Sequence, residues 1–380
     1  MSGAPRYLSY GIIFVVVIAA SVGYFGGGLA QKVRVTTPHI EPAGQLSPPL
    51  LAVHSFPFGN STVQITVPVN SSVYRGARNA DKEITVEGNV SKDTWIADTY
   101  RAMVTDPAQD DFFRDLTGKF RSIRTERELS DDQYLELMAV YVQSLRYETI
   151  GDYPAKFPVE TAMDGAGDCD DKSLLLAGLL SHEGYRVAIF SFGPENHTAI
   201  GIGSDNYLFR DTGYAFVETT NYSYVGVPAT KLAGGRLLSS DPVVIPIGDG
   251  TRLFTSGNET RFLKDTETLT RNRAEEMEPG VKASSVDLDM KRAQIRTIET
   301  RMAALKDSGD LTGYSIQAGL HISLVAEYDA ELARELPVFL QFKNYADVHN
   351  RIASNAFDRK GVFEYVMQNP GGVNFSIAIE

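Results

Sequence analysis

The chain of 380 residues contains 36 Lys and Arg against 48 Asp and Glu, which gives a formal net charge of −12. This acidic balance argues against a general nucleic-acid-binding protein, because such proteins present a basic patch or stripe. Since the chain has a single cysteine, Cys169, it cannot form an internal disulfide, and a secreted disulfide scaffold is excluded.

Residues 7–30 form the first strong pattern: they contain no charged residue and are dominated by Ile, Val, Ala, Phe and Gly. An uncharged run of this length can cross a hydrocarbon core of roughly 30 Å as a helix. We therefore predict a transmembrane anchor over 7–30, with a cleaved signal peptide as the alternative. Such an anchor would make the chain a single-pass membrane protein.

Seven Asn-x-Ser/Thr sequons follow this segment. Their density favours an extracytoplasmic location for the catalytic domain, because such sites are glycosylation acceptors in secreted proteins. Basic residues flank the predicted anchor on both sides, so the positive-inside rule does not decide its orientation. The sequons are at Asn60, Asn70, Asn89, Asn196, Asn221, Asn258 and Asn374.

The remainder of the chain divides by composition and periodicity. Residues 31–60 are rich in proline and predict a linker, and 61–94 predict a β-rich accessory segment. Over 95–250, helical periodicity up to about 147 is followed by short strand-like runs, a pattern typical of an α+β domain. The predicted strands are 185–192, 197–202, 206–210 and 213–220.

Residues 265–380 predict a helical C-terminal region, with further helices over about 314–336 and 343–367. The segment "MKRAQIRTIETRMAALKDSGD" has one apolar stripe at helical spacing, but it is too short to predict a coiled coil. Two interpretations stay open. The region is either an appendage that packs on itself and the core domain, or an arm that binds a protein partner.

The stretch "GAGDCDDKS", residues 165–173, surrounds the single cysteine with acids. A glycine-rich turn leads into a predicted helix that begins near Cys169, and the dipole at a helix start lowers the pKa of a thiol. The amide of Cys169 could also donate to an oxyanion. Asp168 is a natural N-cap, and Asp170 and Asp171 in the first turn would support the helix start.

A catalytic thiol also needs a histidine within reach and an acceptor that orients the histidine. His197 opens the second predicted strand, and Glu218 lies in the last one. If these strands pair, the carboxylate can reach the imidazole. The alternative is a buried structural cysteine with an unrelated loop histidine.

Gln143, on a predicted helix, is a candidate oxyanion donor; the alternative is that it is an exposed glutamine of that helix. A calcium site among the acids is the less favoured interpretation of "GDCDD". The sequence has no zinc, phosphate-loop or dinucleotide motif, so we expect no metal and no cofactor.

The run "YVQSLRYETIGDYPAKFPVETAMDGAGDCDDKSLLLAGLLSHEGYRVAIFSFGPENHTAIGI", followed by "YAFVETT", resembles the transglutaminase-like cysteine peptidase superfamily, notably its membrane-anchored archaeal members. The resemblance implies a papain-like α+β fold with Cys169 as nucleophile, His197 as general base and Glu218 as the orienting acid. The family usually has Asp at the third place, so Glu218 is a departure.

Together these patterns predict a membrane-anchored thiol hydrolase that cleaves amide bonds of a protein or peptide through an acyl intermediate on Cys169. The alternative is a catalytically weak or inactive module of the same fold that binds partners through its C-terminal helices.

Overall fold

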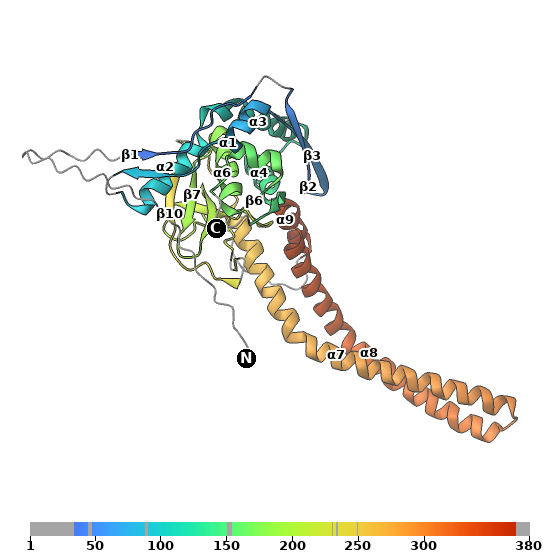
Figure 1. Ribbon diagram of the computed structural model, residues 1–380. Coiled ribbons are helices and arrows are strands. Elements are labelled where there is room, and N and C mark those ends of the chain that lie inside the picture. Colours follow the sequence, from blue (N-terminus) through green and yellow to red (C-terminus); the bar gives the residue numbers. More distant parts are fainter. Residues whose placement is uncertain are drawn as a thin grey trace, which may run out of the picture.

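The computed structural model describes residues 34–44, 48–87, 90–149, 154–229, 231–232, 235–248 and 250–369 (Figure 1). The mixed α+β class is as expected, but the expectation of a transmembrane helix is corrected. In the described part of the chain no helix is both long and apolar enough to cross a bilayer. The single-pass, extracytoplasmic location is withdrawn with it. The segment on which it rested, 7–30, lies outside the described residues.

The N-terminal part of the chain is more ordered than its proline content indicates. Strands β2 (Leu50–Phe58) and β3 (Ser61–Val69) form an antiparallel hairpin. Phe56 and alternate residues of β3 are buried in the main core, as is Ile40. The expectation of a linker over 31–60 is therefore wrong for 50–58. The exposed Leu51 and Val53 obscure the alternation that would have predicted the strand.

The segment predicted as β-rich, 61–94, is mixed. It contains β3, helix α1 (Ser71–Asn79), the short strand β4 (Thr85–Glu87) and the beginning of α2. Strand β4 pairs with β1 (Arg34–Thr36). Since the β2–β3 hairpin shares the core of the helices that follow, this segment is part of the domain and not an accessory to it.

Helices α2 to α6 form most of the helical half of the domain, and a single turn of 3₁₀ helix at Pro107–Gln109 lies between α2 and α3. Helix α6 is central: it contacts α2, α3, α4, α5 and strands β7 and β8, and its residues 174–180 are all buried. Ser130 caps α4 in a capping box, as its sequence indicates. The helices are α2 (Lys92–Val104), α3 (Asp110–Glu126), α4 (Asp131–Ser144), α5 (Pro158–Asp164) and α6 (Cys169–His182).

The β half is an antiparallel sheet with the strand order β10-β7-β8-β9. Its strands are β7 (Val187–Phe192), β8 (His197–Gly203), β9 (Tyr214–Val217) and β10 (Val243–Ile247). One face packs on the helices, and the other face carries a separate aromatic cluster that includes Phe190, Phe192 and Phe216. The predicted strand over 206–210 is absent, because Tyr207 and Arg210 have positive φ angles of 52° and 49° and the segment turns.

The C-terminal region is a long antiparallel pair of helices that projects from the domain, with a short helix at its base (Figure 1). Helices α7 (Gly257–Asp307) and α8 (Leu311–Ser354) form this helical arm, and α9 (Arg359–Gln368) returns to the domain. The two helices predicted over about 314–336 and 343–367 have different bounds, because α8 continues through Pro337 to Ser354 and α9 follows as a separate helix. The paired helices are also far longer than the single apolar stripe predicts.

Candidate active site

Acidic side chains cap the N-terminus of α6. The Asp168 carboxylate caps the helix by accepting hydrogen bonds from the amides of Asp170 and Asp171 at 3.0 and 3.2 Å. In return, the Asp171 carboxylate accepts from the amide of Asp168 at 3.2 Å. Gly167 permits this closure, because a Cβ there would lie 2.5 Å from the Cβ of Asp171. Asp168 and Asp171 thus hold the helix-start positions expected from the sequence.

Asp170 has a different position: its carboxylate lies between the thiol and a tyrosine. Sγ of Cys169 lies 3.6 Å from one Asp170 oxygen, and the hydroxyl of Tyr100 on α2 donates to the other at 2.9 Å. Sequence reasoning missed Tyr100, since nothing local links α2 to α6. The Asp170 carboxylate therefore accepts hydrogen bonds from both the thiol and the tyrosine hydroxyl.

The electrostatics of the thiol are opposite to the expectation from the helix dipole. Burial, followed by the negative charges of Asp170 and Asp168, raises the pKa of Cys169 well above its ordinary value, while the amide of Thr198 acts in the lowering direction. Desolvation and like charges outweigh the dipole at this helix start. The resting form of Cys169 is therefore the neutral thiol.

His197 and Glu218 come together as the strand pairing predicts. Nε2 of His197 lies 3.4 Å from Oε2 of Glu218, and the two residues are only 6% and 3% exposed. The register pairs Phe192 with His197 on neighbouring strands, and the two rings stack with centroids 6.2 Å apart. The imidazole thus lies on the face of the sheet that carries the aromatic cluster.

Cys169 lies next to the beginning of β8, the strand that carries His197. The amide of Thr198, the residue that follows His197, lies close enough to the thiol to act in the direction that lowers its pKa. Ser173, one turn further along α6, donates to the carbonyl of Thr198 at 3.2 Å. In the described part of the chain no hydrogen bond joins the thiol to the imidazole directly. Cys169 therefore lies close to the residue next to His197, without a hydrogen bond to the imidazole.

The two carboxylate oxygens of Glu218 have different surroundings. One carboxylate oxygen accepts from the amides of Thr219 and Thr220 at 3.0 and 2.9 Å, and from the Thr220 hydroxyl at 2.7 Å. The other oxygen faces His197. Burial raises the pKa of Glu218, but the imidazole and the Thr220 donors outweigh it, and the pKa lies below its ordinary value.

Gln143 does not face the thiol, which corrects its assignment as an oxyanion donor. Its amide nitrogen donates to the carbonyls of Glu218 and Ser223 at 2.8 and 3.1 Å. Both amide hydrogens are therefore used within the protein. Gln143 instead fixes the segment that follows β9 and with it the position of Glu218.

Lys172 is a further buried residue that sequence reasoning missed. It is fully buried, and its ammonium donates to the carbonyls of Gln143, Leu145 and Thr220 at 3.2, 2.8 and 3.3 Å. Burial lowers its pKa to about 8. The position of a lysine within the apolar run of α6 is the sequence signal that could have identified it. Lys172 ties the end of α4 to the turn that carries Glu218.

The turn before His197 is held by Glu195. Its carboxylate accepts from the amides and hydroxyls of Ser239 and Ser240. Asn196, between Glu195 and the imidazole, has a φ of 50°, a left-handed conformation that asparagine tolerates better than most residues. These contacts fix the direction in which His197 enters β8.

Among the described residues no group of three or more His, Cys, Asp or Glu side chains could hold a metal ion. The arrangement instead offers a thiol, an imidazole with a carboxylate behind it, and the Cys169 amide at a helix start. Comparison of the chain with protein-family models, with curated proteins and with solved structures finds no match.

Proposed function

We propose that the chain is a thiol hydrolase of the transglutaminase-like type, which cleaves an amide bond in a protein or peptide through an acyl intermediate on Cys169. The observation that carries the proposal is the buried pair of His197 and Glu218. His197 is the neighbour in sequence of Thr198, whose amide lies close to Sγ of Cys169. A buried imidazole facing a buried carboxylate is the arrangement that orients a general base and stabilises its charged form.

The first step transfers the thiol proton to His197. Because Nε2 faces Glu218, Nδ1 is the nitrogen that accepts the proton, and the thiol must turn from Asp170 toward the imidazole. The thiolate then attacks the substrate carbonyl carbon. The Cys169 amide, at the first residue of α6, supports the negative oxygen of the tetrahedral intermediate.

The second half returns the proton and releases the products. The imidazolium of His197 donates its proton to the departing amine as the C–N bond breaks, which leaves an acyl-thioester on Cys169. A water molecule then loses a proton to His197 and attacks the thioester carbonyl. Collapse of that intermediate breaks the C–S bond, and the imidazolium returns the proton to the sulfur.

Profiling of peptide cleavage tests the proposal. A mixed peptide library is incubated with the full chain and with the variants Cys169→Ala and His197→Ala, and the products are identified by mass spectrometry. His321→Ala is the matched control, because His321 lies 3.2 Å from Glu299 in an exposed pair on the helical arm. We expect cleavage by the wild type and by the control variant, with none by the other two. Cleavage that persists in Cys169→Ala contradicts the proposal.

A non-catalytic module of the same fold is the second candidate. The raised thiol pKa and the contact of Sγ with Asp170 favour it, because both stabilise an unreactive thiol. This candidate predicts that no peptide in the library is cleaved and that no acyl adduct forms on Cys169. It also predicts that partners are retained by the helical arm and lost when α7 and α8 are removed.

A further inference from the structure

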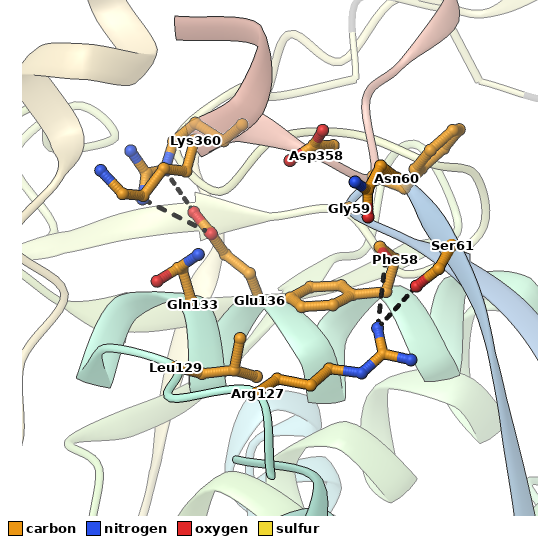
Figure 2. Close-up of a pocket in the computed structure, with 12 residues that line it drawn as sticks. Phe58, Gly59, Asn60, Ser61, Arg127, Leu129, Gln133, Glu136, Asp358 and Lys360 are labelled. Carbon is orange, nitrogen blue, oxygen red and sulfur yellow. Dashed lines mark hydrogen bonds and ion pairs between the residues drawn. The ribbon is translucent and has the colours of Figure 1, made fainter. Parts of the chain in front are cut away.

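A cavity of about 370 Å³ lies where three distant segments meet, away from Cys169. Its walls are the β2–β3 turn, the connection between α3 and α4, and the beginning of α9 (Figure 2). The volume lies within the range of pockets that hold small organic molecules, about 300 to 1,000 Å³. The place of this cavity at the base of the helical arm makes it a candidate binding site.

The charges inside the cavity are of two kinds. Arg359 is buried and its guanidinium is shared between Glu136 and Glu259, so this cluster already has its partners. Asp358 caps α9 by accepting from the amide of Gly361 at 3.0 Å. These groups build the wall, and the other charged side chains that line the cavity are Arg127 and Lys360.

The remaining charged groups are cations. Arg127 donates through one nitrogen to the hydroxyl of Ser61 at 3.0 Å and to a backbone carbonyl at 3.5 Å. Within the described ranges no carboxylate lies at ion-pair distance from it, although the chain has more acids than bases. Lys360 pairs with Glu364 across one helical turn, where 47% of the lysine side chain is exposed. Such exposed pairs contribute little and exchange readily.

A neutral donor and an apolar wall complete the site. The side-chain oxygen of Gln133 accepts from the amide of Ser130 at 3.2 Å, while its amide nitrogen has no acceptor among the described residues. Leu129 and Phe357 are half-buried and line the cavity. Figure 2 shows the guanidinium of Arg127 beside Ser61 on the hairpin, with Gln133 and Lys360 at the other end of the view.

We propose that this cavity binds a small organic anion, with its carboxylate or phosphate held by Arg127 and Lys360 and its apolar part against Leu129 and Phe357. A guanidinium offers paired donors that match either anion. The ligand bridges the hairpin, α4 and α9, and so joins the helical arm to the domain. Binding does not depend on the chemistry of Cys169.

Calorimetric titration of the full chain tests the proposal, with benzoate and phenyl phosphate as probes at constant ionic strength. Benzamide, which has the same ring without the charge, is the ligand control. We expect saturable binding of one or both anions and none of benzamide. If only benzoate binds, the site is a carboxylate site; if only phenyl phosphate binds, it is a phosphate site. The absence of saturable binding by either anion, or equal binding of benzamide, overturns the proposal.

Variants locate the site. Arg127→Gln and Lys360→Glu should each weaken anion binding by about tenfold or more, because each removes a charged hydrogen-bond donor. Arg296→Gln, at an exposed arginine on α7, is the matched control and should bind as the wild type does. Thermal unfolding of each variant without ligand verifies its fold. Since Lys360 is on the surface, Lys360→Glu keeps the test decisive if Arg127→Gln fails to fold. Unchanged affinity in a folded variant of either cation contradicts the assignment.

Discussion

Nε2 of His197 and Oε2 of Glu218 lie 3.4 Å apart, and neither atom has a hydrogen-bond partner in the described part of the chain. Each therefore responds chiefly to the charge on the other. A proton taken up by the imidazole converts this contact into a buried ion pair, which would lower the energy of the charged base in the proposed reaction. The contact links the fold of the sheet to the proposed chemistry.

Replacement of Glu218 by Gln should lower kcat for peptide cleavage by on the order of a hundredfold or more, because the imidazolium loses its countercharge. The amide oxygen can still accept from Thr219 and Thr220, so the unfolding midpoint should change little. Steady-state kinetics and thermal unfolding measure the two effects. Glu364→Gln, an exposed acid on α9, is the control. An unchanged kcat in Glu218→Gln would remove the acid from the mechanism.

Replacement of Asp170 by Asn should make the thiol more acidic. The carboxylate next to Sγ raises the pKa of Cys169 together with burial, and asparagine removes the charge while it keeps an acceptor for Tyr100. The pH midpoint of alkylation by iodoacetamide should fall by about one unit. Asp111→Asn, at an exposed acid of α3, should leave it unchanged. A pH midpoint of alkylation that is unchanged or higher in Asp170→Asn would contradict this prediction.

Lys172 should make the stability of the protein depend on alkaline pH. Burial lowers its pKa to about 8, against 10.5 for a free lysine. Between these values the folded state binds fewer protons than the unfolded state, so the free energy of unfolding rises with pH. Across this window the wild type should gain about 3 kcal/mol relative to Lys172→Met. Urea unfolding at several pH values measures the difference, and parallel curves for the two proteins would refute the prediction.

The ion-pair cluster of Arg359 with Glu136 and Glu259, at the base of the helical arm, should be essential for the stability of the fold. Arg359→Met leaves the buried Glu136 without its countercharge, at a cost of about 3 to 5 kcal/mol. Arg334→Met breaks an exposed pair with Glu335 on the arm and should cost less than about 1 kcal/mol. Chemical denaturation of both variants gives the comparison. A similar small effect for both would mean that Arg359 is not the joint between arm and domain.

Local chemistry explains what the sequence could predict. The helix start at Cys169 follows from the capping preference of Asp168, and the pairing of β8 with β9 follows from two apolar runs separated by turns. These signals lie within a few residues of the elements they determine. For the same reason the approach of His197 to Glu218 could be expected before the structure.

Other features depend on contacts between distant segments. The role of Gln143 requires the carbonyls of Glu218 and Ser223, and the burial of Lys172 requires the packing of α6 beneath β8 and α4. The sign of the pKa shift at Cys169 depends on how deeply the thiol is buried, which no local pattern gives. The continuity of α8 through Pro337 likewise depends on its pairing with α7, which compensates for the missing hydrogen bond.

The rate of Cys169 alkylation by iodoacetamide, measured from pH 6 to 9 in the wild type and in His197→Ala, tests the central claim most directly. Cys169 is the only cysteine, so every adduct reports this site. If His197 is the base that accepts the thiol proton, the wild type should react about tenfold faster near neutral pH, with the two rates converging at alkaline pH. Identical rates for the two proteins across the whole range would contradict the assignment of His197 and Cys169 as a catalytic pair.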